Sequence, residues 1–409
     1  MEKLLTKTIL ILSAGLEAIP IIQKAKSMGC YVVVLDGYES APGIKYADDL
    51  IISSTFDVAG SVEKAKNYSQ NKRTLDGVMS AGHDAPHTVA HIAHALALAG
   101  VPVATAEMAV DKVAMKDKFA KDGVAIPWYS SVDDFQHLQQ LVKQHGLPLV
   151  IKPVDGRGAR GVLRLSDQVD LEWAYNYSVS QSGRGQVMVE RFLSGPQIST
   201  ESMVINGQTL TPGFSDRNYE LMDKFAPFII ENGGDLPSFL SQDLQSRVKQ
   251  TVHQAAMSLG VTMGVVKGDV VVNEGVPHII EITTRLSGGY FCSHEIPLNT
   301  GVDFVGCVIK SALGEKVLEE ELTPKYQKSV CQRYMFPEKG VVKNITGVDL
   351  IKHRNEVELC EMRVEIGEKL AELDNHTKRT GVIIVMGSDR QNAQNNAVSA
   401  INSIKIDLV

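Results

Sequence analysis

Cysteine is scarce in this chain of 409 residues, and its placement excludes several kinds of site. No Cys-x-x-Cys pair occurs among the five, which are Cys30, Cys292, Cys307, Cys331 and Cys360. An odd number of widely separated cysteines argues against a disulfide framework and against a structural zinc site. Reduced thiols are typical of cytoplasmic proteins, so we expect a cytoplasmic location.

Long apolar runs and an excess of basic charge are also missing. No segment reaches the ~18 uninterrupted apolar residues of a membrane-spanning helix. The first apolar run, residues 8–12, has the length of a buried strand rather than of a signal peptide. The net charge is −7 and the pI is about 5.9. We therefore expect neither a membrane nor a nucleic acid as partner, although a local basic cleft for a phosphate ligand is compatible with these numbers.

The N-terminal part of the chain alternates short apolar strands with helices. Strands are predicted at 8–12 and 31–35, with a helix over 17–28 between them, and further strands at 49–52 and 77–80. This alternation is typical of a parallel α/β sheet. The first turn lacks the three spaced glycines of a dinucleotide fingerprint, which makes a dinucleotide-dependent dehydrogenase the weakest hypothesis.

A strand predicted at 147–153 leads into a loop rich in glycine and arginine. Lys152 is the one charged residue of this strand, so we expect its ammonium group at a cavity mouth or beside an anion. The loop contains Gly156, Arg157, Gly158, Arg160 and Gly161. Glycine backbones can turn N–H groups toward phosphate, although a ligand-free hairpin turn has the same composition. No Gly-Lys-Ser/Thr sequence ends the loop, which excludes a P-loop.

The next strand ends in a hinge that could hold a flat ring. It begins at residue 186 and leaves into the hinge residues Glu190, Arg191, Phe192 and Leu193. Exposed backbone N–H and C=O groups between apolar neighbours are suited to an adenine ring.

Residues 265–289 place acids, a base and glycines on two apolar strands that form a hairpin. If Asn273 pairs with Pro277, Asp269 falls opposite Glu281 on one face of the hairpin. Two carboxylates about 5 Å apart repel each other unless a cation lies between them. Hard oxygen ligands of this kind suit Mg²⁺ that carries phosphates. The alternative is a pair of solvated acids on a half-exposed hairpin.

Four features occur in one order: Lys112, Lys152 with its glycine loop, the hinge, and the hairpin with its two acids and Arg285. Together they resemble the ATP-grasp superfamily over essentially the whole chain. The resemblance implies an α/β and α+β multidomain fold with a parallel-sheet N-terminal domain and a small C-terminal β-rich region. The implied boundaries are 1–105 for the N-terminal domain, 106–320 for the ATP-grasp region with a lid at about 125–190, and 321–409 for the C-terminal region.

The resemblance also implies roles for individual residues. Lys112, Lys152 and the loop from Gly156 to Gly161, with Arg157, would contact ATP phosphates, and Glu190 to Leu193 would hold adenine. Asp269 and Glu281 would bind Mg²⁺, or Mn²⁺ in its place. Two positions depart from the usual pattern. Thr283 stands where the family often has a metal-binding Asn, and Gln197 stands where it often has a ribose-binding Glu, for which Glu201 is a second candidate.

The segment from Glu281 to Gly289 is similar to carboxylate–amine ligases that join amino acids, and is less similar to biotin carboxylases and carbamoyl phosphate synthetases. In this branch Arg285 and the Gly288 N–H would stabilise the oxyanion. Glu231 would contact the substrate amine or cap its own turn, in which Gly234 replaces a common His. The implied activity is ATP-dependent amide formation through an acyl phosphate. Activation of bicarbonate or carbamate, and nucleotide binding without ligation, remain open, and a homodimer is expected from the resemblance alone.

Overall fold

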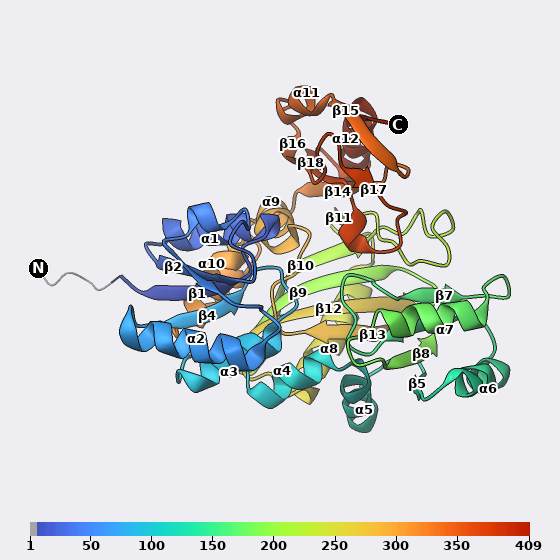
Figure 1. Ribbon diagram of the computed structural model, residues 1–409, viewed down its shortest axis with the longest axis horizontal. Helices are drawn as coiled ribbons and strands as arrows, with labels where there is room; N and C mark the ends of the chain where they lie inside the picture. Colours follow the sequence, from blue (N-terminus) through green and yellow to red (C-terminus); the bar gives the residue numbers. More distant parts are fainter. Residues whose placement is uncertain (1–5) are drawn as a thin grey trace, which may run out of the picture.

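The computed structural model describes residues 6–409. Four parts surround the centre of the molecule: an N-terminal lobe, a small lid, a long central sheet and a C-terminal region (Figure 1). This α/β and α+β arrangement agrees with the predicted fold class.

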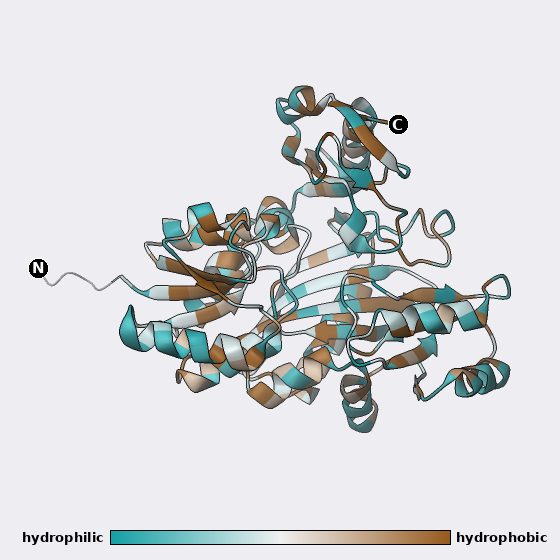
Figure 2. Cartoon of the chain, in the orientation of Figure 1, coloured by the Kyte–Doolittle hydropathy of each residue, from teal (hydrophilic) through white to brown (hydrophobic). Residues whose placement is uncertain are grey.

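The N-terminal lobe is a parallel four-stranded sheet in the order β3-β2-β1-β4, as the alternation predicted. Its strands are β1 (Thr8–Leu12), β2 (Tyr31–Asp36), β3 (Asp49–Ile52) and β4 (Gly77–Ser80). Since the strands are buried, both sheet faces need a cover. Helices α1 (Ile19–Ser27) and α10 (Phe304–Ala312) cover one face, and α2 (Val58–Asn71) and α3 (Pro86–Ala95) cover the other. Figure 2 shows the brown apolar strands beneath helices with teal outer faces.

The lid is an antiparallel sheet in the order β5-β8-β6-β7. Its elements are β5 (Tyr129–Val132), α6 (Phe135–His145), β6 (Leu149–Pro153), β7 (Leu163–Leu165), α7 (Leu171–Ser180) and β8 (Val187–Arg191). Asp134 and Asp170 begin the two helices, because their side chains accept hydrogen bonds from first-turn N–H groups.

The sequence pattern predicts one helix over 108–121, and this prediction is wrong. The structure has α4 (Val103–Val110) and α5 (Lys112–Asp122). Asp111 between them is extended, with φ −109° and ψ 104°, and its side chain accepts from the N–H groups of Val113 and Ala114. Lys112 therefore opens α5, with Lys116 one turn further along the same face.

The central sheet has eight strands in the order β13-β12-β9-β10-β11-β14-β18-β16. The first five are β9 (Gln197–Ile205), β10 (Gln208–Arg217), β11 (Gly234–Leu236), β12 (Gly264–Asn273) and β13 (Val276–Thr283), and α8 (Gln242–Ser258) packs against them. The sequence pattern also predicts a strand that begins at residue 228 and ends in a glycine turn, and this prediction is wrong. Phe228 forms one isolated bridge, to Leu163, and β11 begins only after Gly233, which has a φ of +94°.

The C-terminal region continues this sheet, because β14 pairs with β11 in the antiparallel direction. It contains β14 (Ser329–Met335), β16 (Val357–Met362), β18 (Gly381–Gly387) and α12 (Arg390–Ser403), with β15 (Gly340–Thr346), β17 (Lys369–Leu370) and β19 (Lys405–Leu408) as a separate small sheet. Short helices are α9 (Ile296–Thr300), α11 (Val348–Lys352), η1 (Leu16–Ala18), η2 (Ile44–Tyr46), η3 (Phe291–Glu295), η4 (Glu319–Leu322) and η5 (His376–Lys378).

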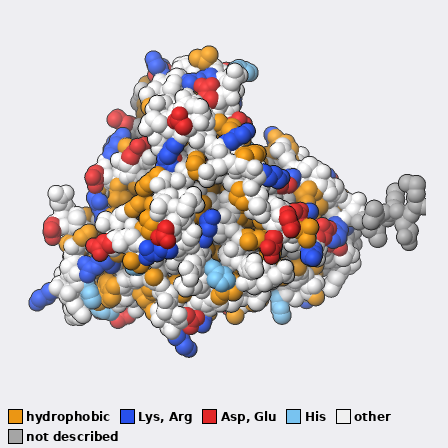
Figure 3. All heavy atoms as spheres, turned by 180° about the vertical axis from the view of Figure 1, so that it is seen from behind, with side chains coloured by type: hydrophobic (Ala, Val, Ile, Leu, Met, Phe, Trp, Pro, Cys, Tyr) orange, Lys and Arg blue, Asp and Glu red, His pale blue; other side chains and the backbone are white. Residues whose placement is uncertain are grey.

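The sequence predicts neither a membrane-spanning helix nor an excess of basic charge, and the structure can be compared with both predictions. Within residues 6–409, none of the helices combines the length and apolarity that crossing a membrane requires. On the face drawn in Figure 3, acidic and basic side chains are interspersed rather than gathered by sign.

The β12–β13 hairpin brings Asp269 opposite Glu281, but by a different register from the one predicted. Asn273 pairs with Val276 rather than Pro277. A β-bulge leaves Ile280 unpaired between Ile279 and Glu281, and this extra residue restores the Asp269–Glu281 pairing. Ile279 packs toward α8, whereas Ile280 and Glu281 both line a cavity on the opposite face.

The hairpin turn itself gives a first test. Glu274 and Gly275 have φ of +49° and +76°, the left-handed conformation of a two-residue type I′ turn. Gly275→Ala should weaken the turn by about 1 kcal/mol, and so raise hydrogen exchange of the tip amides about fivefold. Glu274→Asn, which favours this conformation, should slow that exchange. Equal exchange in both variants would contradict this turn geometry.

Candidate active site

A cavity of about 630 Å³ opens where the four parts of the molecule meet. The residues predicted for the site that line it are Lys112, Lys152, Gly156, Arg157, Gly158, Glu190, Arg191, Phe192, Leu193, Gln197, Glu231, Asp269, Glu281, Arg285 and Gly288. Gly161 does not line it. A Cβ on Gly161 would lie 2.8 Å from Cγ of Pro153 and 2.9 Å from Cβ of Gln181, so this glycine folds the loop back onto the lid.

Two buried lysines share one buried carboxylate at the lid end of the cavity. Lys152 Nζ lies 2.5 Å from Glu190 Oε1, and Lys116 Nζ lies 2.8 Å from Glu190 Oε2. Burial lowers the pKa of Lys116 to about 8, although Glu190 opposes the shift. Burial alone would raise the pKa of Glu190, but the two ammonium groups lower it to about 2. Sequence reasoning missed Lys116, whose one signal was its position one turn after Lys112.

The glycine loop contacts the N-terminal lobe, the start of α5 and the C-terminal region. Lys112 Nζ donates to the Gly156 carbonyl at 2.8 Å, and the Arg157 guanidinium lies 3.9 Å above the ring of Phe56. The carbonyl of Gly158, which has a φ of +59°, accepts from the His376 N–H at 3.0 Å. The loop therefore lies across the cavity mouth, where its amides can reach a phosphate chain.

At the hinge, two of the backbone N–H groups proposed to bind adenine already donate hydrogen bonds within the protein. The Arg191 N–H donates to the Trp128 carbonyl at 2.8 Å, and the Phe192 N–H donates to the Pro148 carbonyl at 3.4 Å. No hydrogen bond within residues 6–409 uses the Leu193 N–H. Leu193 is therefore the hinge donor left for a ring nitrogen.

The two acids of the hairpin meet different cations. Asp269 accepts from Arg217 at 2.7 Å and from Lys267, whereas Glu281 lies 3.3 Å from Lys112 Nζ. Burial alone would raise the pKa of Asp269, but Lys267 and Arg217 hold it far below its usual range. No cluster of three His, Cys, Asp or Glu side chains suited to a metal occurs in the described chain. A pair of carboxylates fits Mg²⁺ that takes its remaining ligands from phosphate and water.

Arg285 and the glycine turn after β13 form one end of the cavity, named the reacting end here because the sequence predicts the oxyanion site at these residues. Arg285 Nε donates to Asp84 Oδ1 of the N-terminal lobe at 2.6 Å. Glu201 accepts from the Ser287 N–H at 2.8 Å, and Glu17 accepts from the Gly289 N–H at 2.7 Å. Within the described residues the Gly288 N–H between them has no such partner, so it is the amide available to an oxyanion.

Three residues near the glycine turn do not line the cavity. Glu201 was a candidate for ribose, but it is fully buried beneath the glycine turn and does not line the cavity. Cys292 and His294 do not line it either. The Cys292 thiol is buried in the apolar core and donates to the Ser287 carbonyl at 3.4 Å.

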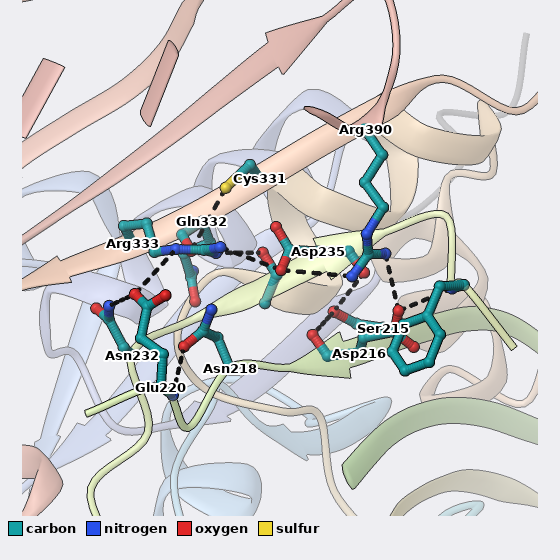
Figure 4. Close-up of polar contacts among 12 residues, drawn as sticks. Ser215, Asp216, Asn218, Glu220, Asn232, Asp235, Cys331, Gln332, Arg333 and Arg390 are labelled. Atoms are coloured by element: carbon teal, nitrogen blue, oxygen red, sulfur yellow. Dashed lines mark hydrogen bonds and ion pairs between the residues drawn. The ribbon is translucent and has the colours of Figure 1, made fainter. Parts of the chain in front are cut away.

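The Glu231 turn rests on a buried polar network between the central sheet and the C-terminal region, drawn in Figure 4. Arg333 contacts Asp235 at 3.1 Å, and Arg390 contacts Asp216 at 2.8 Å. The Asn232 side chain donates to Glu220 at 2.7 Å. These pairs link β10, β11, β14 and α12, so the C-terminal region fixes the position of the turn that carries Glu231.

Glu201 provides a test that depends on pH. Burial raises the pKa of Glu201 to about 7, although its bonds from Ser287 oppose the shift. An acid with a raised folded pKa favours folding at low pH, and this contribution disappears as pH rises toward that value. The shift corresponds to a loss on the order of 3 kcal/mol between about pH 4.5 and pH 7.

Glu201→Gln keeps the shape and removes the titration. Its stability should fall less than that of the wild type between pH 5 and pH 7.5, measured by urea unfolding at each pH. Parallel curves for the two proteins would show that Glu201 is not the titrating group.

Comparison with known proteins identifies two domains and a shared fold. Residues 109–289 match an ATP-grasp domain, and residues 333–409 match the L-amino acid ligase C-terminal domain 2. The crystal structure of L-amino acid ligase from Bacillus licheniformis has a TM-score of 0.84 at 21% identity, over 99% of both chains, which shows a shared fold.

Relatives in sequence are distant. Uncharacterized protein y4rH of Sinorhizobium fredii is 24% identical over 344 residues, 82% of this chain and 70% of that protein. D-alanine–D-alanine ligase of Gloeobacter violaceus is 28% identical over 195 residues, 45% of this chain and 62% of the ligase, so the match spans less than two thirds of that enzyme. The chain therefore contains an ATP-grasp domain and the C-terminal domain 2 of the L-amino acid ligases, and it is similar to ligases of the carboxylate–amine class.

Proposed function

We propose that this protein joins a small carboxylate, an amino acid or a close relative, to an amine at the expense of ATP, releasing ADP and phosphate. The observation that carries the proposal is the shared cavity. Lys112 and Lys152, the acids Asp269 and Glu281, and the Arg285–Gly288 pair all line it.

A carboxylate is a poor acyl donor until its oxygen becomes a good leaving group. Transfer of the γ-phosphoryl group of ATP to the substrate gives an acyl phosphate, and the amine then displaces phosphate. Lys112, Lys152 and the loop amides would neutralise the charge on the phosphoryl oxygens. Mg²⁺ on Asp269 and Glu281 would supply further positive charge at the phosphates.

The residues at the reacting end would orient the acyl group. The Arg285 guanidinium, a planar fork of N–H donors, would hold the carboxylate and later the tetrahedral oxyanion. The Gly288 N–H would donate to the same oxygen. Closure of the glycine loop would keep water from the acyl phosphate.

The direct test is an ADP-release screen over pairs of amino acids, with mass detection of the product. ADP formed only with bicarbonate would favour activation of bicarbonate or carbamate instead. Nucleotide binding without ADP release across the panel would indicate a protein without ligase activity. Homodimerisation, use of Mn²⁺ and a cytoplasmic location remain predictions of the same proposal.

Arg285→Ala should lose ligation by about 10²-fold or more, because an oxyanion donor is removed. ATP binding, measured by calorimetry, should be retained. Arg247→Ala, which removes an exposed arginine of α8, is the matched control and should keep full turnover. Unchanged turnover in Arg285→Ala would overturn the role given to Arg285.

Glu281→Gln should raise the Mg²⁺ concentration needed for half-maximal ADP formation by about tenfold or more, because a charged oxygen ligand is lost. Titration of Mg²⁺ at fixed ATP measures the effect. An unchanged Mg²⁺ requirement would place the metal elsewhere.

A further inference from the structure

Arg379, at the C-terminal end of the cavity, is buried without a carboxylate of its own. It follows η5 and lines the cavity, with 8% of its side chain exposed. Nη2 donates to the backbone carbonyl of Glu231 at 2.6 Å, and the guanidinium lies 3.8 Å above the ring of Tyr334. Nε is buried and has no hydrogen-bond partner within the described residues. A buried donor left unpaired is costly unless a ligand compensates for it.

The acid nearest to Arg379 is already engaged. The Glu231 carboxylate lies 3.5 Å from Arg379 Nη2, but Arg217 forms a closer ion pair with it. Arg217 also holds Asp269, which in turn holds Lys267. In this connected group three cations meet two carboxylates, so one positive charge is uncompensated. A metal ion on Asp269 would increase the excess.

The neighbours of Arg379 do not supply the missing negative charge. His376 lines the cavity as a neutral ring, because burial lowers its pKa far below its usual value. Burial likewise lowers the pKa of Arg379 to about 10. Arg363 differs, because it contacts two acids, Glu17 at 2.7 Å and Glu361 at 3.1 Å. Burial opposes the shift, but Glu17 and Glu361 contribute to a raised pKa of Arg363.

The wall around Arg379 is polar and adjoins the reacting end. Gln332, Tyr334 and Thr377 line this part of the cavity. The Tyr334 hydroxyl lies 2.5 Å from the position that a Cβ would take on Gly289. Tyr334 therefore lies between Arg379 and the glycine turn after β13. A pocket for an aliphatic side chain would have apolar walls. These walls favour a charged group held close to the reacting carboxylate.

We propose that Arg379, stacked on Tyr334, binds a carboxylate of the substrates other than the one being activated. The inference rests on the proposed ligase function and narrows its substrates to those that bring a second carboxylate. That group is either the side-chain carboxylate of an acidic donor amino acid or the α-carboxylate of the acceptor. The guanidinium fork suits a carboxylate in both cases.

The experiment uses the full-length protein and the substrate pair found in the ADP-release screen. KM and kcat are measured for that pair, for an acceptor whose α-carboxylate is replaced by carboxamide, and for a donor whose side-chain carboxylate is replaced in the same way. The variants are Arg379→Gln and Arg379→Lys. Arg354→Gln, which removes an ion-paired arginine of the same region outside the cavity, is the control.

Arg379→Gln should raise KM for the substrate whose carboxylate Arg379 binds by about ten- to a hundredfold. KM for ATP should be unchanged. The matching carboxamide should be used equally by wild type and variant, and this identifies donor or acceptor as the source. Arg379→Lys keeps the charge without the fork, so it should show a smaller increase of the same selectivity, and it replaces the Gln variant if that one does not fold.

Equal losses with carboxylate and carboxamide, or a fall in kcat alone, would overturn this inference while leaving the ligase function intact. Absence of ADP release from the wild type with every pair would instead overturn the proposed function, and the inference with it.

Discussion

The Glu17 carboxylate connects three parts of the molecule at the reacting end of the cavity. One oxygen accepts from the Gly289 N–H and the other pairs with Arg363, each at 2.7 Å. The N-terminal lobe, the turn after β13 and the C-terminal region therefore meet on one side chain. Since Glu201 takes the Ser287 N–H on the other side, the two carboxylates together set the direction of the Gly288 amide. The geometry of this turn depends on how the lobes dock. If the Gly288 N–H is the proposed oxyanion donor, this docking holds it in place before the reaction begins.

Ion pairs hold the charged side chains that are proposed to bind phosphate and metal. A charged ligand can replace one partner in each of these pairs. Lys152 and Lys116 share Glu190, and Asp269 is held by Arg217 and Lys267. These pairs keep buried charges compensated in the free protein. A nucleotide with its metal brings both signs of charge, so phosphate can take over the ammonium groups while the cation takes over the carboxylate. The free site is thereby stable and still prepared for a highly charged ligand.

Local patterns in the sequence were sufficient for the N-terminal sheet, because apolar strands follow from neighbours in the chain. The glycine loop and the paired acids are also local patterns, and most residues predicted for the site line the cavity. Lys116 could not be separated from a solvated lysine, since its partner Glu190 lies on another element. The bulge at Ile280 adds one residue to a strand and leaves no mark in the alternation of side chains. Glu17 and Arg363 are far apart in the sequence, so only the assembled fold reveals their contact.

The C-terminal region has a direct part in the site, since its strands extend the central sheet rather than forming a detached unit. β14 pairs with β11, which directly follows the Glu231 turn, and brings Tyr334 to the cavity. Arg379, between η5 and β18, then reaches the Glu231 backbone. One continuous sheet thus carries the β12–β13 hairpin at one edge and β14, with Tyr334, toward the other. The distance between the hairpin acids and Tyr334 is therefore set by strand spacing, which a folded sheet changes very little.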